Sequence, residues 1–542
     1  AWPHKDCVLE GGQTKEDQKR DEVFWNETLA PDSIDRLLDP KALTNFKRYE
    51  GVRNDNDEFE VEEKKVVDDK IDITKENLIL KGNNLLALSS LLKTHRGKIK
   101  LIYIDPPYNT GNDSFGYNDK FNHSTWLTFM NNRLTVAKEL LKSDGVIFVQ
   151  CDDNEQAHLK VLMDEIFGSD NFDSTITTVV KTEGRRYGNL AKTHEYILLY
   201  AKDIYKTKMY EIDKENHKFS YSDEIGGFDF TDLRNQNAAA FNSKNRPNLV
   251  YPFYVEESID KQGFSKVSLE KKEGYYEVYP IVVNGNQSVW RWGREKALMN
   301  QKNNILARKG SDNITRIYQK YRSSTTMAKT VWFDKDFISN KGTKELDKLF
   351  GKKMFDFPKP EKFIKRIIEL STTEGDLVLD YHLGSGTTAS VAHKMNRGYI
   401  GVEQMDYINT VTTERLKKVI NGEQGGISED VNWKGGGSFI YGELMEHNQK
   451  YINQIQEAET KENLINIWHK MEDKAFLSYQ FDKSIFNQRL EAFKTASLDD
   501  MKKYLIEILD KNQLYVNLSE IDDKSINVSE EDKKLNKSFY KK

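Results

Sequence analysis

The chain has 542 residues, 37% of them hydrophobic, and a formal net charge of −5. This length suffices for about three or four domains, and the near-balance of charge excludes a uniformly basic nucleic-acid-binding protein. Two isolated cysteines, Cys7 and Cys151, exclude a disulfide framework or a cysteine zinc site, so we expect no metal. No signal core and no apolar run of about 20 residues occurs, which favours a cytoplasmic protein without membrane association.

Residues 1–70 form a charged N-terminal extension that ends in NDNDEFEVEEKKVVDDK, a pattern typical of a solvated connector rather than a strand or helix. Strand and helix patterns then alternate over 71–203. The alternating segments are LILKGNNLLALSSLL, KIKLIYID, a helical stretch around STWLTFMNNRLTVAKELL, the strand VIFVQCD, the helix EQAHLKVLMDEIFG and the strand HEYILLYAKD. This alternation predicts βαβ units in a mainly parallel sheet.

The alternation stops over 204–335, where mixed strands and loops interleave aromatic and basic residues, as in SVWRWGREKA and RIYQKYRSS. It resumes over 336–445. The last part, 446–542, is rich in Lys, Glu and Asn and spaces its apolar residues as helices do. The sequence therefore predicts an α/β domain in two segments, an insertion between them and a C-terminal helical region.

The strand LIYI ends in an acid, two prolines and a tyrosine: Asp105, Pro106, Pro107 and Tyr108. Proline cannot donate a hydrogen bond to a sheet, so the chain leaves the sheet just after Asp105. A carboxylate and an aromatic ring are thereby held at the carboxyl end of a strand. Ligands bind at that edge in open α/β sheets. An ordinary proline turn with a packed tyrosine explains these four residues equally well when they are taken alone.

A second strand, LVLD, leads into the turn YHLGSGTT and then a helix. Gly384 and Gly386 permit a tight turn with close approach to a ligand, and the helix start offers free N–H groups. The next strand, YIGVE, ends in Glu403, which suits the hydroxyls of a ribose. Each feature alone is also explained by a tight connection or a helix cap. Their combination in one sheet predicts a nucleotide-like cofactor site.

Together these residues resemble the amino-group DNA methyltransferases that use S-adenosylmethionine, in the β-class order with the catalytic motif first. The resemblance implies a Rossmann-like S-adenosylmethionine-dependent methyltransferase sheet, with 204–335 as the target-recognition insertion. It implies four catalytic residues, Asp105, Pro106, Pro107 and Tyr108. It also implies a cofactor site made of Asp105, Lys359, Pro360, Asp380, Tyr381, His382, Gly384, Ser385, Gly386, Thr387, Thr388 and Glu403.

One residue departs from the family pattern. The cofactor turn of this family usually has Phe two residues before its first glycine, where this chain has His382. The aromatic contact with the cofactor is then changed or supplied by Tyr381. We expect the imidazole of His382 to be neutral and packed rather than a catalytic base.

The resemblance extends to the modification (Mod) subunit of type III restriction–modification systems, through GNNLLALSSLL, THEYILLYAKD and RPNLVYPFY. It implies a homodimer that methylates double-stranded DNA and joins a helicase–endonuclease restriction subunit. Asp rather than Ser at the start of the motif favours adenine N6 by resemblance. Cytosine N4 remains open, as do a non-catalytic DNA-binding subunit and methylation of RNA or of a protein glutamine.

Basic residues in and beside the insertion are candidate DNA contacts through phosphates or guanine edges. They are Arg185, Arg186, Arg234, Lys244, Arg246, Arg291, Arg294, Arg316 and Arg322. Each is equally explained as a solvated surface charge. Trp290 and Trp292 alternate with Arg291, which predicts that the tryptophans face a core and the arginine faces outward.

Overall fold

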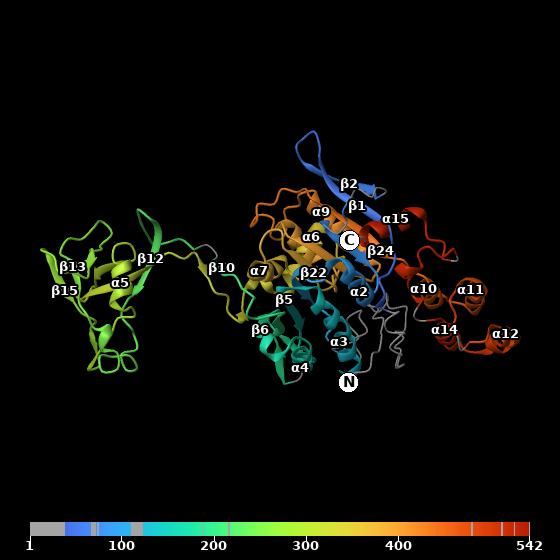
Figure 1. The fold of residues 1–542 in the computed structure, drawn as a ribbon, viewed down its shortest axis with the longest axis horizontal. Helices are drawn as coiled ribbons and strands as arrows, with labels where there is room; N and C mark the ends of the chain where they lie inside the picture. The colour runs from blue at the N-terminus through green and yellow to red at the C-terminus, as the bar shows by residue number, and fades with distance from the viewer. Residues whose placement is uncertain are drawn as a thin grey trace. The chain divides into compact units, whose positions relative to one another are not determined.

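The structure is a computed structural model that describes residues 38–66, 72, 75–109, 123–187, 189–214, 217–478, 481–510, 513–524 and 526–540. It divides into two compact units, one made of Ala1–Tyr210 with Ala328–Lys542 and the other of Glu211–Met327 (Figure 1). The insertion expected over 204–335 contains the second unit. Cys7 and most of the expected N-terminal extension lie outside the described residues.

The first unit is built on a large mixed sheet. Its strands are β1 (Leu43–Arg53), β2 (Phe59–Lys65), β3 (Leu78–Lys81), β4 (Ile99–Ile104), β5 (Leu141–Cys151), β6 (Phe172–Val179), β9 (His194–Ala201), β21 (Val331–Trp332), β22 (Leu377–Asp380), β23 (Gly398–Glu403) and β24 (Ser438–Leu444). Their order is β2-β1-β24-β3-β23-β22-β4-β5-β9-β6-β21. The strands from β24 to β5 run parallel, which confirms the α/β prediction, while β9 is antiparallel to β5 and β6.

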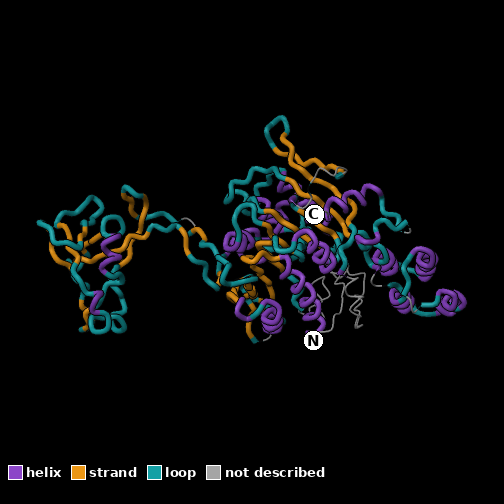
Figure 2. The backbone as a smooth tube through the Cα atoms, viewed as in Figure 1, coloured by secondary structure: helices purple, strands orange, loops and turns teal. Residues whose placement is uncertain are grey.

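Helices cover this sheet, as the purple coils beside orange strands in Figure 2 show. They are α2 (Asn84–His95), α3 (His123–Leu140), α4 (Gln156–Phe167), α6 (Ser339–Phe350), α7 (Glu361–Ser371), α8 (Thr387–Lys394) and α9 (Thr413–Ile420). Ile102 and Ile104 of β4 join a hydrophobic cluster with α2 and α3, whereas Tyr103 contacts Phe363 of α7. Because side chains alternate along a strand, α2 and α7 cover opposite faces.

The C-terminal region is helical, as predicted, and packs within the first unit. Its helices are α10 (Gln449–Glu457), α11 (Lys461–Lys474), α12 (Lys483–Gln488), α13 (Leu490–Thr495), α14 (Leu498–Glu507) and α15 (Glu530–Tyr540). Helices α10, α11 and α14 contact one another, and α15 contacts β1 and α2. The buried Trp468 and Phe539 belong to the same hydrophobic cluster as the α2 and α3 side chains, so this region shares the main core.

The prediction of a solvated connector before residue 70 was wrong for 43–65. These residues form the hairpin β1–β2, and β1 pairs with β24 at the edge of the sheet. Tyr49 is buried and its ring stacks on Phe439 at 4.9 Å. The outer strand carries charges that pair across the hairpin, such as Lys47 with Glu63 at 3.0 Å. Backbone hydrogen bonds hold an edge strand in its sheet, and such a strand tolerates charged side chains. The charged composition of these residues therefore did not indicate a strand.

The second unit contains small sheets around its own core. Its elements, with the short hairpin that precedes it, are β7 (Arg185–Tyr187), β8 (Leu190–Lys192), β10 (Ile212–Asp213), β11 (Tyr221–Asp223), β12 (Gly226–Asp232), β13 (Phe253–Glu256), β14 (Val267–Ser268), β15 (Tyr275–Val278), β16 (Val282–Val283), β17 (Asn286–Gln287), α5 (Arg294–Asn300), β18 (Ile305–Lys309), β19 (Thr315–Tyr321) and β20 (Thr325–Thr326). Trp290 and Trp292 are buried in that core and Arg291 is exposed, which confirms the alternation. Among the described helices, none is long and apolar enough to cross a membrane.

Candidate active site

Three acids lie at one edge of the sheet. Strands β23, β22 and β4 are parallel neighbours, with Leu379 paired to Ile400 on one side and to Ile102 on the other. Glu403 and Asp380 end their strands and Asp105 follows β4 directly. Since carboxyl ends of parallel strands share an edge, the catalytic motif and the cofactor turn meet although they are far apart in sequence.

The Asp105 carboxylate is held from two sides. Its Oδ2 lies 2.8 Å from the Lys359 ammonium, and its Oδ1 accepts a hydrogen bond from the Tyr108 hydroxyl. The indole of Trp126 donates to the Pro107 carbonyl at 2.7 Å, which fixes the path of the motif. Burial raises the pKa of Asp105 above its ordinary value, and the Lys359 charge opposes that shift.

A glutamate that the sequence analysis did not single out lies beside this carboxylate. Glu195 begins the antiparallel strand β9, so it reaches the same edge of the sheet from the opposite chain direction. Its Oε2 lies 3.1 Å from the Tyr108 hydroxyl oxygen and 3.6 Å from the Lys359 ammonium. The only signal in the sequence was an acid directly before an apolar strand. Acids at such positions are common in ordinary loops.

The chain after the motif is held by a buried glutamate at the start of α4. Glu155 Oε1 accepts from the Asn109 amide at 2.6 Å and lies 2.8 Å from His123 Nδ1. With His158, these groups bring potential metal-ligand atoms within 4.8 Å of one another. Glu155 thus links Asn109, which directly follows the motif, to His123 at the start of α3.

The turn between β22 and α8 is built around two acids. Gly384 and Gly386 have φ values of +52° and +78°, which an L side chain rarely adopts. The N–H of Gly384 donates to Glu403 at 2.9 Å, and the Thr388 hydroxyl donates to Asp380 at 2.6 Å. Burial raises the pKa of Asp380 to about 7. These contacts tie the turn to the acids that end β22 and β23.

The residues at this turn fit S-adenosylmethionine. The Tyr381 hydroxyl and the His382 Nε2 are buried atoms for which the described residues provide no hydrogen-bond partner, so a ligand can satisfy them. Burial lowers the pKa of His382 to about 3, with Arg133 adding repulsion. The ring lies 5.9 Å from that of Phe129. A neutral, packed imidazole is the state that the sequence predicted.

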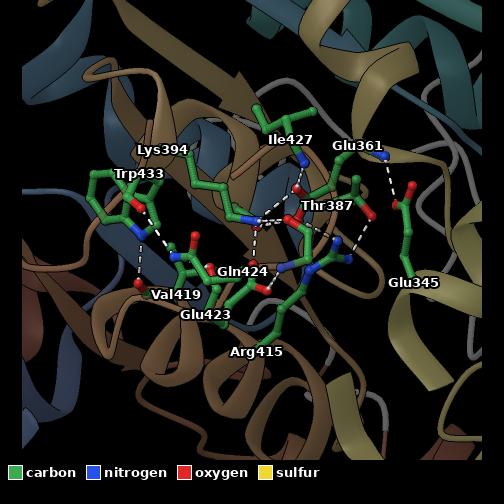
Figure 3. A network of polar contacts seen from close by, with 12 residues as sticks. Glu345, Glu361, Thr387, Lys394, Arg415, Val419, Glu423, Gln424, Ile427 and Trp433 are labelled. Atoms are coloured by element: carbon green, nitrogen blue, oxygen red, sulfur yellow. Dashed lines mark hydrogen bonds and ion pairs between the residues drawn. The ribbon is translucent and has the colours of Figure 1, made fainter. Parts of the chain in front are cut away.

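A buried polar network supports the turn from α7 and α9 (Figure 3). The Glu361 carboxylate lies 2.7 Å from the Lys394 ammonium and 3.0 Å from the Arg415 guanidinium. Arg415 also donates to the Thr387 hydroxyl at 2.8 Å, which ties the network to the glycine turn. A carboxylate with two cationic partners and further hydrogen bonds offsets the cost of burying these charges. Glu361 therefore connects three helices behind the cofactor turn.

Lys359, a predicted cofactor residue, contacts both halves of the site. Its ammonium lies 2.8 Å from the Asp105 carboxylate, and its backbone carbonyl accepts a hydrogen bond from the Thr387 hydroxyl of the turn at 3.2 Å. Pro360 caps the amino end of α7 next to it. The segment from 357 to 360 thus joins the catalytic corner to the cofactor turn.

The candidate DNA contacts separate into two groups. Arg322 holds Asp223 through both carboxylate oxygens at 2.9 and 2.6 Å, Arg316 holds Asp312 in the same way, and Arg234 lies 3.3 Å from Asp232. These three arginines form ion pairs within the second unit, and their expected DNA contacts stay a prediction. The exposed candidates are Lys244, Arg246, Arg291 and Arg294. The side chains of Arg185 and Arg186 lie outside the described residues.

Comparison with known proteins identifies the class. Residues 99–414 match the model of a family described as DNA methylase, which spans both the catalytic motif and the glycine turn. The chain therefore belongs to the DNA methylases, and its methyl donor is S-adenosylmethionine.

Within that family, the chain belongs with the type III modification subunits. It is 41% identical to a probable type III restriction-modification enzyme HindVI Mod subunit of Haemophilus influenzae, over 97% of this chain and 75% of that protein. It is 33% identical to the EcoPI Mod subunit of Escherichia phage P1, over 62% of this chain and 58% of that protein. It is also 33% identical to the type II methyltransferase M.KpnI of Klebsiella pneumoniae, over 63% of this chain and 82% of that protein.

Proposed function

We propose that this chain transfers a methyl group to N6 of an adenine flipped out of double-stranded DNA, as the modification and recognition subunit of a type III restriction–modification system. The observation that carries the proposal is that the Asp105 carboxylate and the glycine turn lie at the carboxyl ends of neighbouring strands. S-adenosylmethionine supplies a methyl group on a sulfonium, which is already a reactive electrophile. The protein's tasks are then positioning and charge compensation.

The catalytic motif provides what an exocyclic amine needs. Such an amine is a weak nucleophile because its lone pair is delocalised into the ring. Hydrogen bonds from the amine to the Asp105 carboxylate and the Pro106 carbonyl localise that pair on the nitrogen. Tyr108 stacks on the flipped base, and stacking is worth about 1–3 kcal/mol, comparable with the few kcal/mol that flipping costs.

The cofactor is held, in this proposal, by the turn after β22. Glu403 accepts hydrogen bonds from the ribose hydroxyls, the N–H groups at the start of α8 line the turn, and Tyr381 contributes its ring and hydroxyl. Target recognition belongs to the second unit, where Lys244, Arg246, Arg291 and Arg294 are exposed for phosphate or base contacts.

The partners follow from the relatives. Mod subunits of restriction-modification enzymes are among them, so we propose a restriction subunit with helicase and endonuclease activity as the partner of this chain. We further propose that the chain acts as a homodimer in the bacterial cytoplasm, where its DNA substrate lies.

The test is single-molecule sequencing of genomic DNA from a methylation-free bacterial host that expresses the wild-type chain or the Asp105→Ala variant. We expect N6-methyladenine at one short sequence motif with the wild type and none with the variant, with cofactor binding largely intact in the variant. Marks on one strand only support the type III assignment. N4-methylcytosine would overturn the base assignment, and an active Asp105→Ala variant would overturn the role of the carboxylate.

A wild-type chain that binds cofactor but leaves the host DNA unmodified points to the other substrates. Methyl transfer to matched DNA, RNA and protein then separates an RNA or protein methyltransferase from a non-catalytic DNA reader. A reader has no use for the carboxylate–proline–tyrosine corner, which is why we rank it lower.

A further inference from the structure

Both oxygens of the Asp105 carboxylate are engaged in the structure. The Lys359 ammonium lies 2.8 Å from Oδ2, and the Tyr108 hydroxyl donates to Oδ1. The role proposed for Asp105 requires one of these oxygens to accept a hydrogen bond from the target amino group. The incoming amino group therefore either shares an oxygen with a present donor or replaces it, and replacement gives it the oxygen without competition. A poorly solvated donor that leaves its acceptor costs free energy unless another acceptor lies within reach.

Glu195 is that second acceptor for both donors. Its Oε2 lies 3.1 Å from the Tyr108 hydroxyl oxygen, within reach of its single hydrogen, and 3.6 Å from the Lys359 ammonium. The side chain of Glu195 is only 17% exposed, so water competes weakly for these contacts. The two groups that occupy Asp105 thus already lie beside a second carboxylate.

Two further side chains fix the direction of the Glu195 carboxylate. The Gln150 amide at the end of β5 donates to Glu195 Oε2 at 2.5 Å, and the Tyr103 hydroxyl of β4 donates to Gln150 Oε1 at 2.6 Å. Because Gln150 is held through its own oxygen, its amide nitrogen is turned toward Glu195. Three neighbouring strands therefore orient Glu195 toward the catalytic corner.

We propose that Glu195 is a positioning residue that receives the Lys359 ammonium and the Tyr108 hydroxyl when the target amino group replaces them on Asp105. The inference rests on the proposed methyl transfer to an exocyclic amine. It assigns Lys359 a shared position between two carboxylates rather than a fixed ion pair with one. A Glu195 that served only to hold β9 in the sheet would affect stability and not the ionisation of Asp105 or Lys359.

The charges at this corner are coupled. Burial raises the pKa of Asp105 and Glu195 raises it further, while Lys359 lowers it. Burial alone would lower the pKa of Lys359, but Asp105 and Glu195 together raise it. The other titratable groups that interact electrostatically with Asp105 are Tyr103, Tyr108, Cys151 and Asp380.

The first variant is Glu195→Gln, which keeps the shape of the side chain and removes its charge. Lys359 then has Asp105 as its only anionic partner. The target amine must compete with the Lys359 ammonium for the Asp105 carboxylate. We expect kcat to fall about ten- to a hundredfold, with unchanged affinity for S-adenosylmethionine. The acid limb of the kcat profile moves to lower pH, because a negative charge that raised the pKa of Asp105 is gone.

The matched control is Asp164→Asn. Asp164 likewise accepts a hydrogen bond from a tyrosine of β9, Tyr200, at 2.7 Å and pairs with an ammonium, that of Lys160, at 2.7 Å, away from the catalytic corner. We expect this variant to keep the wild-type kcat profile.

A second measurement does not depend on activity. The rate at which an acylating reagent labels Lys359 is followed against pH by peptide mass spectrometry, in the wild type and in Glu195→Gln. The pKa of Lys359 should fall in the variant and stay unchanged in Asp164→Asn.

The outcomes separate this inference from the proposed function. Suppose that the wild type is active and that Glu195→Gln is slow, but that its acid limb and its Lys359 labelling are unchanged. This result would overturn the role of Glu195 and leave the methylation proposal standing. A wild type that methylates no DNA would overturn the proposed function, and the labelling of Lys359 would still decide whether Glu195 shares the ammonium.

Discussion

Two neighbouring glutamates near the cofactor turn have pKa values shifted in opposite directions. Burial alone would raise the pKa of Glu361, but Lys394 and Arg415 lower it to about 2. Glu345 on α6 accepts only the backbone N–H of Glu361 at 2.9 Å among the contacts described, and burial raises its pKa to about 7. The negative charge of Glu361 adds to that shift. Glu345 therefore weakens the folded state once it ionises.

This asymmetry predicts a pH-dependent effect of Glu345→Gln. The folded-state pKa lies above the unfolded value of 4.5, so the wild type loses stability as pH rises from about 4.5 to 7. The variant does not lose this stability, because glutamine does not ionise. We expect it to be more stable than the wild type by about 1–3 kcal/mol at pH 8 and equal to it near pH 4. Urea unfolding at both pH values measures the difference.

Glu414→Gln on α9 is the control for this experiment, since Glu414 is partly exposed and pairs with Lys417 on the same helix. A partly exposed ion pair contributes little, so we expect this variant to stay within about 1 kcal/mol of the wild type at both pH values. A Glu345→Gln variant that is equally stable to the wild type at pH 8 would contradict the assignment of a buried, destabilising charge.

At the scale of elements, the connection from β22 to α8 depends on glycine for two separate reasons. Gly386 has a φ of +78°, and a Cβ there would lie 2.8 Å from the Thr412 methyl carbon. The Thr412 hydroxyl in turn donates to the Gly384 carbonyl at 2.6 Å. A side chain at Gly386 would therefore strain the backbone and displace the residue that holds the turn.

We expect Gly386→Ala to weaken S-adenosylmethionine binding by about tenfold or more, since a displacement costing 1.4 kcal/mol already changes an equilibrium tenfold. Isothermal titration calorimetry measures this. Gly351→Ala is the control, because Gly351 has a similar φ of +72° with open space around the added Cβ. That variant should lose a little stability and bind normally. Equal affinity in both variants would show that the turn does not shape the cofactor site.

At the scale of the whole molecule, the second unit is inserted between two strands of the first. Its ends are adjacent, because Ile212 of β10 pairs with Thr326 of β20 and the Lys214 N–H donates to the Ser324 carbonyl at 2.8 Å. The unit also has its own core around Trp290. An insertion with paired ends leaves the parent sheet continuous.

We therefore expect a variant in which a short Gly/Ser linker replaces 214–324 to fold and to bind S-adenosylmethionine with about the affinity of the full chain. Sequence-specific methylation should be lost, because the proposed recognition residues are gone. Calorimetry and sequencing of host DNA test the two statements. Methylation at the wild-type motif would contradict the assignment of recognition to this unit, and an unfolded product would contradict the independence of the two cores.

Local signals accounted for most of the fold and for the two halves of the site. The run LIYIDPPY placed a strand and its end, and LVLDYHLGSGTT placed a strand, a turn and a helix, because apolar periodicity, proline and glycine act through the nearest neighbours. The failures were of another kind. The strand β2 was missed because hydrogen bonds to a partner strand, not its own side chains, hold it in the sheet.

The sequence by itself determined that this chain has a DNA methylase's catalytic motif, a cofactor turn and an insertion between them. Only the tertiary structure decided that Lys359 and Glu195 meet beside Asp105. Those contacts depend on the order of strands, with β4, β5 and β9 side by side and β9 reversed. Strand order is set by burial of the whole sheet, and no short stretch of sequence encodes which distant side chain will meet at its edge.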